Sequence, residues 1–206
     1  MLSLLTQNPM LFIMVVGALV ISLSFHEFAH AFVAVYLGDF TPKAFGRYTI
    51  NPIAHLDPLG SMLLIIAGFG WGKPVPINPF NFKNPLRDQA LVALAGPMAN
   101  FVLATFVALL IKFTGVSGVL FAFMYLIVLY NLFLGFFNLI PFGPLDGFKV
   151  VQGFLPKNLA IQWTQMERYG IFILLLLILS HATGNFLAPL VNFMLTLFGL
   201  GVYSNF

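Results

Sequence analysis

The most constraining feature of this sequence is an almost unbroken apolar stretch from Met10 to Tyr36. At about 1.5 Å of rise per helical residue, it is long enough to cross a hydrocarbon core of roughly 30 Å with some tilt. Lipid offers the backbone no hydrogen-bond partners, so such a stretch has to be helical. Only 7% of the 206 residues are charged, which is too few to cover a water-exposed surface. The sequence therefore predicts a protein that lives in the membrane.

Four further apolar segments follow the first. Gln89–Lys112 and Val116–Ile140 are each long enough to span, and the short break at Gly115 predicts that they form an antiparallel pair. Arg168–His181 and Phe186–Tyr203 are shorter, and they are either two further spans or one bent hairpin.

The segment between Asp39 and Asp88 differs from these apolar segments because seven prolines interrupt it. Proline removes a backbone donor and clashes inside a helix, so no long helix fits here. Lys43–Ile50 and Pro74–Ile77 favour extended edge strands, while Ser61–Gly70 is apolar but too short to span. We expect a re-entrant or membrane-associated β hairpin after the first span.

Together these segments predict an all-α polytopic membrane protein with about five transmembrane helices and this one hairpin. We expect a single domain over residues 1–206, with a core at about 10–155 and C-terminal helices at about 167–204. No cation precedes the first apolar stretch, which is longer than the apolar region of a cleaved signal peptide. We therefore expect it to remain as an anchor.

The nine cations are divided unevenly over the predicted topology. If the hairpin stays on one side, Lys112 lies on the opposite side, and the other eight share one face: Lys43, Arg47, Lys73, Lys83, Arg87, Lys149, Lys157 and Arg168. Cytoplasmic loops are enriched in Lys and Arg, so we expect this face to be cytoplasmic, in the cell membrane, with the N-terminus outside. Because the cations are scattered singly and form no basic patch, we expect no nucleic-acid partner.

Three ionisable residues lie near the cytoplasmic end of the first span, where His26, Glu27 and His30 form an H-E-x-x-H pattern. Residues four apart share a helix face, so the two imidazoles can close on one metal ion. Glu27 lies about 100° round the helix from His26, where it can take a proton from water without being a ligand. The alternative is that all three are buried packing or capping groups, but each unpartnered group would cost several kcal/mol in lipid.

A catalytic zinc site usually has three protein ligands, so two histidines leave one ligand to be found. The chain has no cysteine, and the third ligand must therefore be a histidine or a carboxylate. Asp146 is the strongest candidate, because it lies in PFGPLDG, directly after an apolar span and on the same side. Taken alone it would read as a turn residue. The site would then open near the cytoplasmic face.

Five segments, HEFAH, NPIAHLDPLG, GFGWGKPVPINP, AGPMAN and NLIPFGPLDG, occur in this order along the chain. Together they resemble the site-2 protease family of intramembrane zinc metalloproteases, and the resemblance covers about Ser22 to Val151. It implies one zinc ion per chain as cofactor, with His26, His30 and Asp146 as the metal ligands and Glu27 as the general base.

The resemblance also matches Asn138, eight residues before the aspartate, to a residue that holds the substrate carbonyl or the oxyanion. From the residues alone, an interhelical hydrogen bond from Asn138 is an equally good interpretation. His55, Asp57 and Asn100 lie in matching segments too, without a definite role. Asp57 favours a turn, and His55 could orient a metal ligand. Close packing at Gly96 accounts for the segment that ends in Asn100.

The activity that the resemblance implies is hydrolysis of a peptide bond within or near a transmembrane segment of a substrate protein. A transporter or metal-permeation protein is the alternative, since intramembrane His, Asp and Glu also line ion pathways. That class predicts ligands spread along a path, whereas here they form one H-E-x-x-H group with a single distant aspartate, which favours a fixed catalytic ion. The chain has no room for the PDZ or CBS domains of many relatives, so we expect any regulation to come from a separate membrane protein or from the hairpin.

Overall fold

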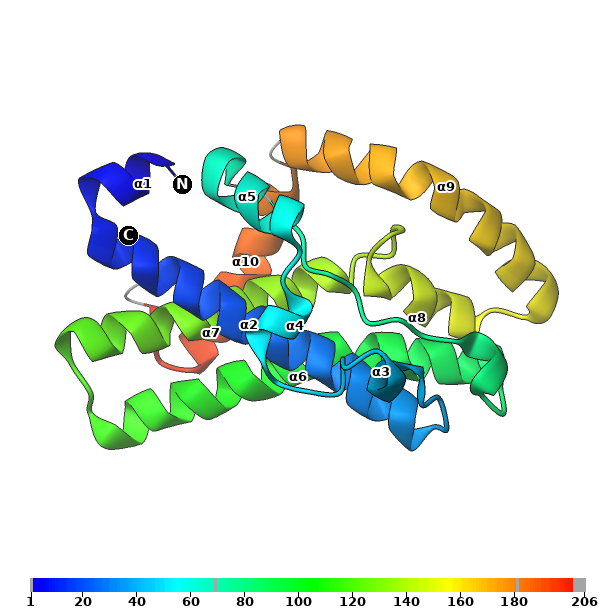
Figure 1. Cartoon of the computed structure of the whole chain (residues 1–206). Helices are drawn as coiled ribbons and strands as arrows, with labels where there is room; N and C mark the ends of the chain where they lie inside the picture. Colours follow the sequence, from blue (N-terminus) through cyan, green and yellow to red (C-terminus); the bar gives the residue numbers. More distant parts are fainter. Residues whose placement is uncertain (1, 69, 181, 202–206) are drawn as a thin grey trace.

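The computed structural model describes residues 2–68, 70–180 and 182–201, which form helices joined by loops (Figure 1). Three of the described helices are long and apolar enough to cross a membrane: α2 (Pro9–Tyr36), α6 (Pro85–Thr114) and α7 (Gly118–Asn138). They correspond to the first three predicted spans. The prediction of an all-α integral membrane protein is confirmed.

These three helices pack against one another, with a short helix α1 (Leu2–Gln7) before α2. Small side chains, Ala18, Ala104 and Ala108, are buried in the shared core and allow the helices to approach closely. Gly115 has a φ of 60°, a left-handed conformation that ends α6 and lets the chain return as α7. The predicted antiparallel pair is therefore confirmed (Figure 1).

The chain continues as α8 (Asp146–Phe154), α9 (Lys157–Leu179) and α10 (Ala182–Leu197). α9 contacts α8 and α10, and α10 packs on α7. The last two predicted spans end at His181 and Tyr203, both outside the described residues. Neither α9 nor α10 is among the described helices that meet the length and hydropathy of a span, so the number of five stays a prediction.

The β hairpin expected after the first span is wrong: the described residues of this segment contain no strand, and one isolated antiparallel bridge joins Leu56 to Gly72. Short helical elements occupy it instead: α3 (Thr41–Ala44), α4 (Pro52–His55), α5 (Pro58–Ala67) and the 3₁₀ turn η1 (Pro79–Asn81). The physical reason lies in the prolines. They exclude a long helix, yet proline suits the first turn of a helix, where its missing N–H costs nothing.

Asp39, which is fully buried, ties the two ends of this segment together. Its carboxylate accepts hydrogen bonds from the Thr41 hydroxyl, the Asn78 backbone N–H at 2.8 Å and the Asn81 amide at 2.7 Å. Burial by itself would raise the pKa of Asp39, but these hydrogen bonds to the charged form lower it below its usual value. The result is a segment held back against the end of α2, with residues 72–78 passing beside that helix (Figure 1).

Candidate metal centre

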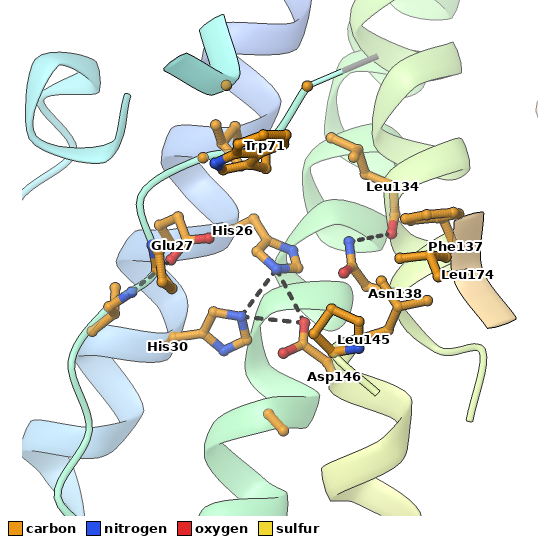
Figure 2. A pocket seen from close by; sticks show the side chains of 18 of the residues that line it. His26, Glu27, His30, Trp71, Leu134, Phe137, Asn138, Leu145, Asp146 and Leu174 are labelled. Atoms are coloured by element: carbon orange, nitrogen blue, oxygen red, sulfur yellow. Dashed lines mark hydrogen bonds and ion pairs between the residues drawn. The ribbon is translucent and has the colours of Figure 1, made fainter. Parts of the chain in front are cut away.

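Three side chains from two elements converge beside α6 (Figure 2). His26 and His30 lie four residues apart on α2, and Asp146 is the first residue of α8. The two histidine Nε2 atoms are 3.0 Å apart. Asp146 Oδ2 lies 3.1 Å from His26 Nε2 and 3.3 Å from His30 Nε2. The structure thus brings together the three residues predicted to be metal ligands.

The opposite edge of each imidazole is held by the protein. His30 Nδ1 lies 2.7 Å from the Val92 carbonyl oxygen, and His26 Nδ1 lies 2.7 Å from Asn100 Oδ1. A carbonyl oxygen can only accept, so His30 must donate from Nδ1, and the neutral ring that binds a metal then carries its lone pair on Nε2. The lone pair of His30 therefore faces the other two members of the cluster.

This arrangement fits a metal ion. Asp146 Oδ2 is buried without a hydrogen-bond partner in the described structure, and lone pairs facing one another at such distances repel unless a cation lies between them. Tetrahedral zinc with ligands at about 2.0–2.1 Å separates neighbouring ligand atoms by roughly 3.3 Å. The observed separations of 3.0–3.3 Å are close to that value.

α6 passes the cluster at Gly96. A Cβ at this position would overlap His30 Nε2 and lie 2.6 Å from His26 Cε1, closer than real Cβ contacts come. Only glycine therefore allows the helix to lie against both rings. The close packing expected at Gly96 is present, and the surfaces that it brings together are the two imidazoles.

Glu27 lies beside the cluster without belonging to the group of converging ligand atoms (Figure 2). Its side chain is buried, and the backbone N–H of Val75 donates to its Oε2 at 3.2 Å. Residues 72–78 thus fix the carboxylate from the side opposite to α2. A carboxylate held in this way can accept a proton at the oxygen that this bond does not engage.

The cluster and Glu27 line a cavity of about 670 Å³. Most of its remaining wall is apolar, with Leu64 from α5, Phe137 from α7 and Leu174 from α9 among the contributing side chains. Asn138 lines the same cavity, and its amide donates to the Leu134 carbonyl at 3.0 Å within its own helix. This bond lies within α7. The interhelical hydrogen bond that was the alternative interpretation of Asn138 is therefore not the one that its amide makes here.

Two other residues from the matching segments have local structural roles. Asp57 is the N-cap of α5 and accepts a hydrogen bond from the Gly60 N–H at 2.8 Å. The Nε2 atom of His55 lies 2.7 Å from the Thr49 carbonyl oxygen. His55 therefore bonds within its own segment, not to a ligand of the cluster.

Two buried polar residues lie behind His26 and were not predicted from the sequence. They are Ser22 on α2 and Asn131 on α7. Asn131 accepts from Asn100 and donates to the Ser22 hydroxyl, at 2.8 and 2.7 Å. The available signal was an asparagine in the middle of an otherwise apolar span, because such a residue needs a partner in lipid.

The compactness of the cluster bears on the alternative function. The potential ligand atoms of His26, His30 and Asp146 all lie within 4.8 Å of one another. Ligands gathered at one point suit a fixed ion, whereas a permeation pathway requires ligands distributed along its length. The transporter alternative is not favoured.

Comparisons with known proteins agree with this geometry. Residues 112–181 match the model of peptidase family M50. The chain is 39% identical over 183 residues to "Putative zinc metalloprotease YwhC" of Bacillus subtilis, covering 84% of each protein. It is 31% identical over 206 residues to "Putative zinc metalloprotease Rip2" of Mycolicibacterium smegmatis, covering 93% of this chain and 76% of that protein. No solved structure gives a significant match. The chain belongs to peptidase family M50, the site-2 protease family.

Proposed function

We propose that this chain is an intramembrane zinc metalloprotease that hydrolyses a peptide bond within or near a transmembrane segment of a substrate protein. The observation that carries the proposal is the convergence of two imidazole Nε2 atoms and one unpartnered carboxylate oxygen beside a buried glutamate. Family membership supports the same class of reaction.

In this proposal His26, His30 and Asp146 hold the zinc ion. When bound there, a zinc ion would supply Lewis-acid chemistry, which lowers the pKa of water towards about 7 and polarises a carbonyl group. The site residues meet the needs of that ion: they supply two imidazole nitrogens and one carboxylate, and the imidazoles are fixed from behind by hydrogen bonds.

Glu27 carries the proton in this reaction. Its carboxylate accepts the proton of the attacking water and later delivers it to the nitrogen of the leaving amine. The Val75 N–H that binds Oε2 keeps the carboxylate beside the cluster, so its position does not depend on the substrate. A general acid and base positioned in this way contributes about 10²- to 10⁴-fold to the rate.

Asn138 is proposed to stabilise the oxyanion. Its amide carries two N–H groups, and the Leu134 carbonyl takes one of them. The second can donate to the substrate carbonyl oxygen as negative charge develops there. Loss of a single donor of this kind costs about 2.7–4 kcal/mol of transition-state stabilisation.

The apolar wall of the cavity suits the side chains of a membrane span. A helical substrate shields its own peptide bonds through backbone hydrogen bonds, so the scissile segment has to unwind before it can enter. We therefore propose that the substrate is a transmembrane protein with a helix that opens locally, and that any regulator is a separate membrane protein acting on this single domain.

The orientation of the chain is part of the proposal. The C-terminal end of α2, α3, the first turns of α6 and the end of α8 lie at one end of the molecule, at the right of Figure 1. The cations of these elements include Lys43, Arg87 and Lys149, whereas Lys112 is near the other end of α6. The excess of cations supports a cytoplasmic position for that end, with the N-terminus outside the cell membrane. α9 and α10 are proposed to complete the membrane-embedded part.

The proposal is tested by reconstituting the protein in lipid vesicles with a single-span substrate and locating the cut by mass spectrometry. The expected cut lies within the span or next to it. A strong zinc chelator abolishes cleavage, and added Zn²⁺ restores it. Cleavage confined to a water-exposed domain of the substrate, or cleavage that persists after zinc removal, would contradict the proposal.

A further inference from the structure

A continuous line of hydrogen bonds runs through the three packed spans and ends at His26. Its members are Ser22 on α2, Asn100 on α6 and Asn131 on α7, and each of these three side chains is fully buried, with 0% exposure. Every step is between 2.7 and 3.1 Å long. No member belongs to the ligand set, and the proposed mechanism uses only the last bond of the line, from His26 to Asn100.

The direction of these hydrogen bonds is fixed at the far end by groups that can only accept. The Ser22 hydroxyl donates to the Ala18 carbonyl at 2.7 Å, so its oxygen is left as an acceptor. The Asn131 nitrogen Nδ2 lies 2.7 Å from that oxygen and 2.8 Å from the Ile127 carbonyl. Both of these neighbours need a donor, so the Asn131 amide has one possible orientation and turns its Oδ1 towards Asn100.

The same reasoning fixes Asn100. Its Nδ2 faces two acceptors, Asn131 Oδ1 at 2.8 Å and the Ser22 carbonyl at 3.1 Å. Both N–H bonds of the amide are therefore used, and its Oδ1 is the atom that lies 2.7 Å from His26 Nδ1. Because this oxygen can only accept, His26 must carry its proton on Nδ1. Its lone pair is then on Nε2, which faces His30 and Asp146.

We propose that Asn100 and Asn131, with Ser22, are positioning residues that hold His26 in the tautomer with its proton on Nδ1. Reversal of either amide would place an N–H against Nδ1 and move the imidazole proton to Nε2, where it would block a metal ion. The line of hydrogen bonds therefore determines whether His26 can act as a ligand. This inference rests on the proposed metal site and extends it to residues on two other helices.

The role of each member follows from its place in the line. Asn100 touches His26 directly, and loss of such an outer partner of a metal-binding histidine typically weakens metal binding about 10- to 100-fold. Asn131 supplies one of the two acceptors that orient Asn100, so its loss weakens binding less, by about tenfold. An aspartate in place of Asn131 still offers Asn100 an oxygen acceptor, whatever its protonation state.

The experiment uses the full chain in detergent micelles, labelled with ¹⁵N histidine and stripped of metal. The ¹⁵N spectrum reports which nitrogen of His26 is protonated, and the signal of His26 is identified by its loss in His26→Gln. Zinc affinity is then measured by competition with a chelator of known affinity. In the native protein we expect His26 protonated on Nδ1.

Asn100→Leu and Asn131→Leu are expected to give His26 signals from both tautomers together with the losses of zinc affinity stated above. Asn131→Asp is expected to retain the native tautomer and to bind zinc within about threefold of the native protein, because Asn100 then keeps both of its acceptors, the aspartate oxygen and the Ser22 carbonyl. Tautomer and affinity should change together in every variant.

A matched pair on α2 separates the proposed role from simple loss of buried polar packing. Ser22 and Ser24 are both buried, and each bonds back to the carbonyl four residues earlier, at 2.7 and 2.6 Å. Only Ser22 accepts from Asn131. Ser22→Ala is expected to weaken zinc binding measurably, and Ser24→Ala is expected to leave it unchanged.

The proposal is overturned if the folded leucine variants keep the native His26 signal and zinc affinity, or if Asn131→Asp is as impaired as Asn131→Leu. It is also overturned if the two serine variants behave alike. The tautomer of the metal-free native protein tests the line of hydrogen bonds by itself. If that tautomer is as expected but zinc does not bind even to the native protein, the proposed metalloprotease function fails and the positioning of His26 does not.

Discussion

The substitution Gly96→Ala isolates the close approach of α6 to the proposed metal centre. It adds one methyl group, removes no hydrogen-bonding group, and suits a helix better than glycine by about 1 kcal/mol. The new Cβ would lie 2.5 Å from His30 Cε1 and 2.6 Å from His26 Cε1, whereas real Cβ contacts essentially never fall below 3.0 Å. These two carbon atoms would have to retreat by the difference, which is 0.4–0.5 Å, and His30 Nε2, which the new Cβ would overlap, would have to retreat further.

A retreat of that size is large for a metal site, where ligand distances are expected within about 0.2 Å of their ideal values. The rings also cannot move freely, because each is held at Nδ1 by a bond of 2.7 Å. Overpacking of this kind costs about 1–3 kcal/mol, which corresponds to about a 5- to 150-fold loss of zinc affinity if the strain is relieved by losing the metal. Cleavage activity at limiting zinc should fall by a similar factor.

The measurement is zinc affinity by chelator competition, together with the thermal stability of the metal-free protein. Gly135→Ala is the matched control: its new Cβ would crowd Phe101 at 2.7 Å, between α7 and α6 and not against the two histidines, and it should leave zinc affinity unchanged. Native zinc affinity in a folded Gly96→Ala protein would refute the reasoning, as would equal losses in both variants.

Two further predictions concern the segments around the site. Because the pKa of Asp39 is lowered in the folded protein, its hydrogen bonds stabilise residues 37–82 fully above the unfolded-state pKa of about 4, and this stabilisation is lost as the pH falls through the lower folded pKa. Hydrogen exchange in these residues should detect the loss on acidification. An Asp39→Asn variant with the same acid profile as the native protein would argue against this role. A Cβ at Gly170 would overlap the Gly143 carbonyl, so Gly170→Ala should displace α9 from the loop before Asp146 and lower the melting temperature. Gly184→Ala should not, because a Cβ at Gly184 would meet open space. Equal melting temperatures for the two variants would show that α9 does not depend on this contact.

The spans and the cluster could be predicted because each depends on few, local properties of the sequence. Lipid requires a long apolar segment to be helical, and a helix places His26 and His30 on one face whatever surrounds it. Asp146 follows from its position after a span on the same side. These inferences need no knowledge of side-chain packing between helices.

The segment after the first span was predicted wrongly because its prolines were read only as helix breakers. The helices α3, α4 and α5 each begin at or next to a proline. Asn51 caps α4, and Asp57 caps α5. An Asn or Asp directly before proline is a start signal for a short helix as much as an obstacle to a long one. The sequence contained that signal.

The hydrogen-bonded line behind His26 could not be predicted in the same way. It depends on which faces of α2, α6 and α7 meet, and on register, so that Ser22, Asn100 and Asn131 fall at one level. Apolar periodicity does not define that register, because spans surrounded by lipid are apolar on every side. A buried asparagine in a span indicates that a partner exists, but not which residue it is.

The central claim is that Glu27 acts on water at a zinc ion held by the other three residues, and one comparison tests it most directly. Native protein, Glu27→Gln and Glu167→Gln are purified, their zinc content is measured, and the rate of cleavage of a single-span substrate is recorded. The chain has two glutamates, and Glu167, exposed on α9, serves as the matched control. We expect one zinc per chain in all three proteins, native cleavage by Glu167→Gln, and a rate at least about 10²-fold lower for Glu27→Gln. Equal cleavage by the native protein and Glu27→Gln at equal zinc content would contradict the account.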